Sequence, residues 1–201
     1  MGRLIVVVGN AGVGKTTLTD RLRGVGDFAV ELEQHEGRPF QRSFSEDLHR
    51  YALPNQIDYL LYRAEQEKLI RRADGVGIQD GGLDLDFFVF TRLFYQKGYL
   101  DEDEYQLCKR LYRLLRTCLP MPDLIVHLDA PLEVVAGRRA KRERALDIAQ
   151  LEDLAQMGAL LGAWLSQVEE GRLLTVDASG EDFLSQENVE QLLREIERRL
   201  G

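Results

Sequence analysis

The sequence predicts a three-layer α/β fold in which a five-stranded parallel sheet carries helices on both faces. Five short apolar runs are typical of buried strands: Arg3 to Val8, Phe28 to Leu32, Val76 to Gln79, Leu124 to Leu128, and Leu173 to Val176. Longer stretches with helical spacing of apolar residues separate these runs. Strands that alternate with helices pair in parallel through right-handed crossovers, which place helices on both faces of the sheet. A chain of 201 residues is expected to form this fold as one domain, residues 1–201.

The first predicted strand leads directly into a glycine-rich loop and a helix. The loop follows the pattern G-x-x-x-x-G-K-[ST] and consists of Gly9, Asn10, Ala11, Gly12, Val13, Gly14, Lys15, Thr16 and Thr17. Its glycines let successive backbone N–H groups point inward at an anion, and the helix N-terminus adds positive charge. We therefore expect a P-loop that binds a nucleoside triphosphate, with Lys15 on the β- and γ-phosphates and the Thr16 hydroxyl on Mg²⁺.

Acidic residues follow two further strands of the predicted sheet. In parallel sheets the ligand crevice lies beyond the carboxyl ends of the strands. Asp80 follows the third strand, where a carboxylate commonly holds the hydrated Mg²⁺ of a P-loop site. Glu33 follows the second strand and is a candidate general base, although a charged residue at this place is also typical of a solvated loop.

A long helix is predicted from about Asn55 to Ala73, after Pro54. Gln56 and Arg63 lie seven residues apart, two helical turns, and therefore project from one face. They are either donors that line a pocket or a polar rim of the core. Asp86 opens the next predicted helix, where the helix dipole favours an acidic residue.

A basic segment follows the fourth predicted strand. It contains Arg138, Arg142 and Arg144, and Arg138 and Arg142 share a helical face at i and i+4. Downstream of a P-loop, this pattern indicates a lid, around residues 138–150, that neutralises charge developing on a transferred phosphoryl group. The alternative is a solvated, charged helix.

The composition limits the partners and the compartment. The formal net charge of −8 disfavours non-specific binding to nucleic acid or to an anionic membrane, so neither is an expected partner. No apolar run approaches the length of a membrane span. The two cysteines, Cys108 and Cys118, match neither a metal site nor a disulfide framework, which favours a cytoplasmic protein.

These residues together resemble the deoxynucleoside kinase family over almost the whole chain. The loop from Gly9 to Thr17 is close to the family's G-x-x-G-x-G-K-[ST], and Glu33 stands where the acid of its E-P-V segment falls. Gln56 and Arg63 match the Q-x6-R pair, and Asp86 matches the acid that follows the E/D-R-S motif. The lid pattern R-x3-R-x-R-x2-E is matched by Arg138, Arg142, Arg144 and Asp147, and the late E-D-F segment by Glu181, Asp182 and Phe183.

The resemblance implies transfer of the γ-phosphate of ATP to the 5′-hydroxyl of a deoxynucleoside, with Mg²⁺ and in a homodimer. It makes Glu33 the catalytic base and places the nucleobase on Gln56, Arg63 and Asp86. The lid residues Arg142 and Arg144 would face the phosphates and Asp147 the substrate. Arg138 would bind ATP, and Asp182 and Phe183 would lie near its adenine.

Two positions differ from the family's pattern. The E/D-R-S motif is here Asp80-Gly81-Gly82, so an arginine beside the phosphates is absent, and Ser45 stands where the family often has a tyrosine that touches the sugar. Two other functions remain open. One is a related P-loop kinase acting on a nucleotide or another small alcohol, and the other is a non-catalytic nucleotide-binding switch. A GTPase is disfavoured, because no N-K-x-D segment is present.

Overall fold

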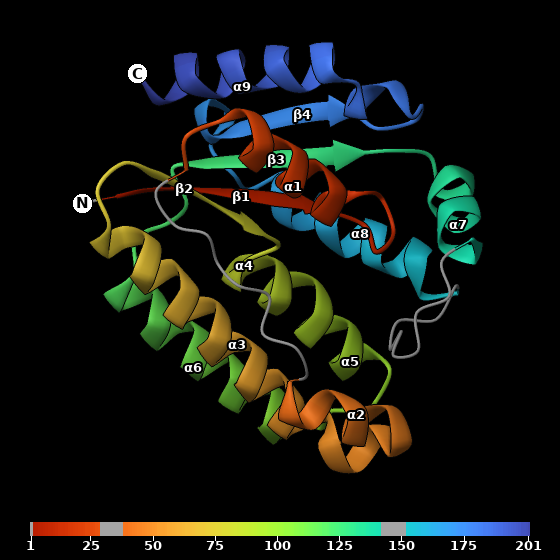
Figure 1. The fold of residues 1–201 in the computed structure, drawn as a ribbon. Helices are drawn as coiled ribbons and strands as arrows, with labels where there is room; N and C mark the ends of the chain where they lie inside the picture. Colours follow the sequence, from red (N-terminus) through yellow and green to blue (C-terminus); the bar gives the residue numbers. More distant parts are fainter. Residues whose placement is uncertain (1, 29–37, 142–151) are drawn as a thin grey trace.

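The chain folds around one parallel sheet, shown in Figure 1. The computed structural model describes residues 2–28, 38–141 and 152–201. The four strands in these ranges are β1 (Arg3–Gly9), β2 (Val76–Asp80), β3 (Leu124–Asp129) and β4 (Leu173–Asp177). They lie in the order β2-β1-β3-β4, and all pairs are parallel. The three-layer α/β prediction is therefore confirmed.

Four of the five predicted strands are confirmed. The expected number of strands is wrong for the described residues. Each observed strand begins at the predicted residue and ends one residue later. The described part of the chain has a four-stranded sheet where five strands were expected. Of the fifth predicted strand, Phe28 lies in coil and residues 29–32 lie outside the described residues.

β1 lies inside the sheet and separates the two halves of the core. Its side chains alternate, because successive residues of a strand point to opposite faces. Leu4, Val6 and Val8 pack in one cluster, whereas Ile5 and Val7 pack in the other. All five side chains are almost completely buried, which explains why the run is continuously apolar rather than alternating with polar residues.

Helices cover both faces of the sheet. One face carries α1 (Lys15–Val25) and α9 (Gln186–Leu200), which contact each other. The other face carries α3 (Leu48–Arg72), α4 (Leu83–Leu85), α5 (Arg92–Gln96), α6 (Glu102–Cys118) and α8 (Asp153–Leu165). The remaining helical elements are α2 (Pro39–Glu46), α7 (Leu132–Ala140) and the two short 3₁₀ turns η2 (Glu170–Arg172) and η3 (Asp182–Leu184). No described helix is long and apolar enough to cross a membrane.

Helix α3 begins before Pro54, contrary to the prediction that it follows this proline. Asp47 caps the helix, with its side chain accepting a hydrogen bond from the Arg50 N–H at 3.1 Å. Pro54 is therefore inside the helix, and its missing N–H leaves the Arg50 carbonyl without the usual partner. Helix α2 packs against α3.

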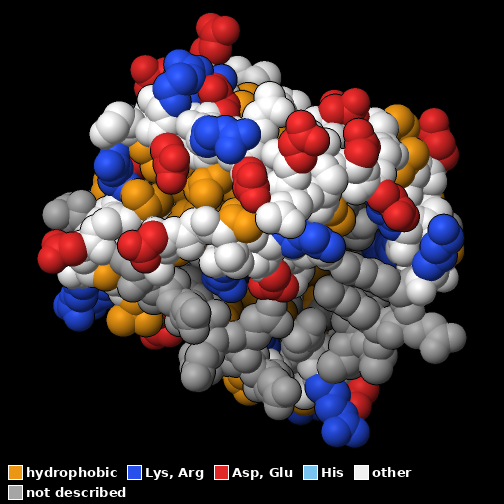
Figure 2. Space-filling view, turned by 45° about the horizontal axis from the view of Figure 1, so that its top comes forward, with side chains coloured by type: hydrophobic (Ala, Val, Ile, Leu, Met, Phe, Trp, Pro, Cys, Tyr) orange, Lys and Arg blue, Asp and Glu red, His pale blue; other side chains and the backbone are white. Residues whose placement is uncertain are grey.

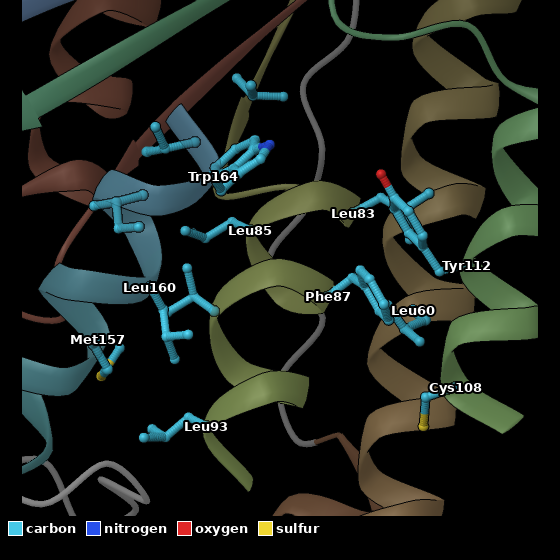
Figure 3. Packing of buried hydrophobic residues seen from close by; sticks show 14 of the residues in the cluster. Leu60, Leu83, Leu85, Phe87, Leu93, Cys108, Tyr112, Met157, Leu160 and Trp164 are labelled. Atoms are coloured by element: carbon cyan, nitrogen blue, oxygen red, sulfur yellow. The ribbon is translucent and has the colours of Figure 1, made fainter. Parts of the chain in front are cut away.

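Between α4 and α5 the chain forms a single π-helical turn, η1 (Asp86–Thr91). Figure 3 shows Phe87 of this turn pointing toward Leu60 and Tyr112, on α3 and α6. The Phe87 and Tyr112 rings stack with centroids 4.2 Å apart. This packing fixes η1 between the two long helices, and η1 carries Asp86 and Thr91.

The carboxyl ends of the parallel strands share one edge of the sheet, as the arrowheads of β1, β3 and β4 in Figure 1 indicate. The glycine-rich loop after β1 and the turn after β2 lie at this edge. The carboxyl edge of the sheet is thus where the candidate functional residues meet. Over the described surface of the face in Figure 2, acidic and basic side chains are interspersed.

Candidate functional site

The loop after β1 has the geometry of an anion-binding P-loop. Gly9, Gly12 and Gly14 have φ angles of 153°, 90° and 116°, a region that side chains with a Cβ rarely adopt. Lys15 opens α1, and its Nζ donates hydrogen bonds to the carbonyls of Gly9 and Asn10 at 3.1 and 3.0 Å. These bonds hold the Lys15 ammonium group at the opening of the loop, where it would contact a bound phosphate.

Thr16 and Asp80 supply two oxygen ligands that fit Mg²⁺. The Thr16 hydroxyl donates to Asp80 Oδ2 at 2.5 Å, which joins the start of α1 to the end of β2. Magnesium in phosphate sites is commonly held by one or two protein oxygens together with water and substrate phosphates. The pair therefore suits the ion, and no larger cluster of ligating side chains is found within the described residues.

A cavity of about 600 Å³ lies beside the P-loop. Its lining includes Gly14, Arg138, Asp182 and Phe183. Arg138 donates hydrogen bonds to the carbonyls of Val13 and Ala178 at 3.2 and 2.6 Å, and its guanidinium lies 5.4 Å from the centre of the Phe183 ring. The structure thus brings the predicted residues Arg138, Asp182 and Phe183 together at the P-loop.

On the opposite side of Asp80, Arg63 and Asp86 form a largely buried ion pair. Arg63 Nε donates to Asp86 Oδ2 at 2.8 Å, and Arg63 Nη1 donates to the Asp80 carbonyl at 2.8 Å. Burial raises the pKa of Asp86, although the charge of Arg63 opposes this rise. Burial also acts to lower the pKa of Arg63, but Asp86 and Asp80 outweigh it and the pKa is raised. The pair links α3 to the π turn.

Gln56 lies in the same region but has no hydrogen bond to Arg63 or Asp86 side chains among the described residues. Its side chain is 2% exposed, and its Oε1 accepts a hydrogen bond from Thr91 Oγ1 at 2.9 Å. Thr91 Oγ1 is also 3.0 Å from the Asp86 carbonyl oxygen. The three predicted residues Gln56, Arg63 and Asp86 therefore form one buried polar group, joined in part through Thr91.

The backbone at Gly81 explains why this position holds glycine and not the arginine of the family's E/D-R-S motif. Gly81 has a φ of +75°, and a Cβ added there would lie 3.1 Å from Arg63 Nη2. An arginine at this position would therefore need a different backbone and a displaced Arg63. The second departure is also visible: Ser45 is exposed on α2 and donates to the Arg42 carbonyl at 2.7 Å.

Four predicted site residues belong to the two internal segments that the structure does not describe. Glu33 lies in residues 29–37, and Arg142, Arg144 and Asp147 lie in residues 142–151, so all four are outside the described residues. Of the predicted lid, Arg138 is in α7. The roles of these four residues and the lid itself remain predictions.

The structure also adds polar residues that the sequence patterns did not indicate. Tyr59 lies on α3 between Gln56 and Arg63, and burial together with the Asp86 charge raises its pKa to about 12. Its helical spacing, three residues after Gln56 and four before Arg63, was an available signal. Thr91 gave no such signal, because its place depends on the π turn.

A second charged cluster lies one turn from the ion pair. Arg116 donates to both carboxylate oxygens of Glu67, at 2.8 and 2.9 Å, and to Asp84 at 3.0 and 2.6 Å. Tyr112 donates its hydroxyl to Asp84 at 2.7 Å. The cluster ties α3, α4 and α6 together, and its Asp84 precedes Asp86 by two residues.

Comparison with known proteins identifies the family of this chain. The family model "deoxynucleoside kinase" matches residues 5–200. The deoxyadenosine/deoxycytidine kinase of Bacillus subtilis (strain 168) is 27% identical over 197 residues, which cover 96% of this chain and 91% of that protein. The deoxyadenosine kinase of Dictyostelium discoideum is 30% identical over 158 residues, 76% of this chain and 64% of that protein.

The fold is shared with solved structures. The deoxyadenosine kinase of M. mycoides, solved with dCMP and dCDP, superposes with a TM-score of 0.80 at 20% identity, covering 97% of this chain and 99% of that one. The same enzyme with bound dATP superposes with a TM-score of 0.79 at 19% identity. Because the family model spans nearly the whole sequence, the chain belongs to the deoxynucleoside kinase family and is a phosphotransferase.

Proposed function

We propose that the protein transfers the γ-phosphate of ATP to the 5′-hydroxyl of a deoxynucleoside. The observation that carries the proposal is the position of Asp80 between two polar groups. Its carboxylate bonds to Thr16 of the P-loop, and its carbonyl bonds to Arg63 of the Gln56, Arg63 and Asp86 group. A phosphate donor and an acceptor bound to these groups would meet at the end of β2.

The cavity beside the P-loop is the proposed site of the donor. Lys15 supplies positive charge to its phosphates, while Arg138 and Phe183 offer a cation and an aromatic face to its base. A structure of the M. mycoides relative was solved with bound dATP, which is a purine nucleoside triphosphate. Mg²⁺, held by Thr16 and Asp80, would neutralise charge on the phosphates.

The acceptor would place its base on Gln56, Arg63 and Asp86. Gln56 offers donors and an acceptor, Arg63 only donors, and an ionised Asp86 only acceptors, so the group can read a base edge. Glu33 is the proposed general base that takes the proton of the 5′-hydroxyl. Arg142 and Arg144 would cover the phosphates, and Asp147 would lie toward the substrate.

Steady-state phosphorylation of the four deoxynucleosides and their ribonucleoside counterparts, with ATP or GTP, tests this proposal. Phosphorylation of at least one deoxynucleoside is expected. Turnover of nucleoside monophosphates alone would indicate a nucleotide kinase. Tight ATP binding without turnover of any acceptor would indicate the non-catalytic alternative.

We also propose that the enzyme is a homodimer that acts in the cytoplasm. Exposed leucines recur at two-turn intervals on the neighbouring helices α3 and α6, namely Leu61, Leu69, Leu107 and Leu114. Leu114 is the most exposed of these side chains, at 61%. Both cysteines are free thiols, as a reducing compartment would keep them. Sedimentation velocity of the parent and of a Leu114→Glu variant tests the dimer, which the substitution should weaken.

A further inference from the structure

The side chain of Asn10 joins the P-loop to the first turn of α8. Its Nδ2 donates a hydrogen bond to the Leu154 carbonyl at 2.8 Å, and its Oδ1 accepts one from the Ala11 N–H at 2.9 Å. A backbone N–H can only donate and a backbone carbonyl can only accept, so these two partners fix which end of the amide faces which. The Asn10 amide is thus bound at one end by its own loop and at the other end by α8.

The bond to Ala11 fixes the peptide plane that follows Asn10. This plane contains the Ala11 N–H and the Asn10 carbonyl, and in a trans peptide these two groups point in opposite directions. Holding the N–H against the Asn10 side chain therefore turns the Asn10 carbonyl to the other side. There the carbonyl accepts a hydrogen bond from Lys15 Nζ at 3.0 Å. The Asn10 amide thus orients one of the carbonyls that hold the P-loop lysine.

The first turn of α8 is itself firmly held. Leu154 is almost completely buried and packs in the same apolar cluster as Val13 of the P-loop. Asp153, which is also buried, forms an ion pair with Lys97, the residue that follows α5. The Leu154 carbonyl is therefore a well-anchored partner for the Asn10 amide.

Gly158 faces this contact from α8, one turn after Leu154. A Cβ built at Gly158 would lie 3.5 Å from Asn10 Nδ2, and of the described residues outside α8 no other lies within 4 Å of it. At Gly162, one turn further along the helix, a Cβ would meet none of the described residues outside α8 within 4 Å. The two glycines therefore provide a matched pair of positions, one that contacts Asn10 and one that does not.

We propose that Asn10 is a positioning residue that fixes Lys15 for the phosphates of ATP, with the first turn of α8 as its support. This inference rests on the donor site of the proposed function. Without the amide, the peptide plane between Asn10 and Ala11 is free to rotate, and Lys15 loses one of the carbonyls that hold it. Ordering the lysine again when ATP binds then costs conformational entropy, which lowers the affinity for ATP.

The test measures the binding of ATP with Mg²⁺ by calorimetry. Asn10→Ala removes the amide, and Gly158→Val presses two methyl groups against it. Each should raise the Kd for ATP about fivefold, the effect of one neutral hydrogen bond. Gly162→Val is the matched control and should keep the Kd of the parent. The Kd for a deoxynucleoside should be the same in all four proteins, whereas a general loss of packing would change both constants.

Two double variants test the route of the effect. Asn10→Ala combined with Gly158→Val should raise the Kd no further than either change alone, because both remove the same contact. In a Lys15→Ala background, Asn10→Ala should cause no further loss of ATP affinity if it acts through the lysine. Asn10→Ser, whose hydroxyl is too short to reach Leu154, serves as a second variant if Asn10→Ala does not fold.

Three results would overturn the inference. The first is a parent-like Kd for ATP in the folded alanine or serine variant of Asn10. The second is an equal rise of the Kd in Gly162→Val, which would indicate a general effect on α8. The third is a further loss of affinity from Asn10→Ala in the Lys15→Ala background.

Measuring turnover beside binding keeps the two proposals apart. A parent that binds ATP but phosphorylates no deoxynucleoside would contradict the proposed function, while the dissociation constants for ATP would still test Asn10. A parent that phosphorylates deoxynucleosides, with an unchanged Kd for ATP in Asn10→Ala, would contradict only the inference. A parent that binds no ATP would contradict both.

Discussion

Replacing Arg116 with methionine should lower the free energy of unfolding more than any single substitution at an exposed position of the protein. The guanidinium makes five hydrogen bonds at 2.6 to 3.1 Å, two to Glu67, two to Asp84 and one to the carbonyl of Pro120. Glu67 is 0% exposed and Asp84 is 2% exposed. Methionine fills a similar volume but leaves two buried carboxylates without their cation.

The expected loss follows from the burial of this cluster. Removing one partner of a buried ion pair typically costs about 3–5 kcal/mol, because the remaining charge stays desolvated. Here two carboxylates lose the same cation, which places the expected loss of unfolding free energy at the upper end, about 4–5 kcal/mol. Protonation of one carboxylate would limit the cost.

The assay is urea unfolding of Arg116→Met and the parent between pH 5 and pH 8. Burial raises the pKa of Glu67, and the bonds to Arg116 act against this rise. Without Arg116 the folded-state pKa moves further above that of the unfolded chain. A carboxyl group with a raised folded pKa stabilises the fold below the unfolded pKa, and this contribution is lost as pH rises through the folded pKa. The deficit of the variant should therefore shrink toward pH 5.

Arg113→Met is the matched control, since Arg113 is exposed on the same helix. Its effect should stay within about 0.5 kcal/mol. Glu67→Gln should recover part of the stability when added to Arg116→Met, because it removes one of the two unpaired charges. A deficit below about 1 kcal/mol, or one that does not change with pH, would refute the assignment of a buried charge cluster.

Four further substitutions address the site. Lys15→Ala should abolish phosphorylation and sharply weaken ATP binding by calorimetry while the far-ultraviolet circular dichroism stays unchanged; unaltered affinity would contradict the P-loop assignment. Asp86→Ala should raise the KM for the nucleoside and not for ATP, since each buried group left unpaired costs about 1–3 kcal/mol; a loss of stability with no change in nucleoside KM would make the pair purely structural. Glu33→Gln should lower kcat by about 10²–10⁴ with little effect on ATP affinity, whereas Glu31→Gln should do far less. Gly81→Ala should lower the unfolding free energy by about 1–2 kcal/mol because of its positive φ, as measured by urea unfolding, and should raise the nucleoside KM through Arg63.

Local sequence patterns predicted the strands and the P-loop well. Continuous apolar runs such as Leu4 to Val8 are typical of strands that are buried on both faces, and β1 is buried in this way. The glycine pattern of the loop requires backbone angles that few other residues adopt, so its function could be anticipated. Gln56 and Arg63 were found because helical spacing places them on one face.

Features that depend on contacts between distant elements were not predictable in this way. The start of α3 was misplaced because Pro54 usually begins or interrupts a helix, whereas here tertiary packing keeps it inside. The π turn has no distinctive composition, so neither η1 nor the position of Thr91 could be derived from the sequence. The partners of Arg116 lie 32 and 49 residues away along the chain, so no local pattern indicates this cluster.

The turn after β2 shows why glycine fits at a position where the family's pattern has arginine. Gly81 lies against Arg63, and its Cβ would stand 3.1 Å from Arg63 Nη2. The same guanidinium bonds to the Asp80 carbonyl and the Asp86 carboxylate. Arg63 therefore occupies the space into which a side chain at position 81 would extend. The substitution Gly81→Arg should therefore displace Arg63 and lower the phosphorylation rate. Steady-state kinetics would measure this effect. A rise in kcat would contradict the steric argument and would show that the glycine only removes a useful arginine.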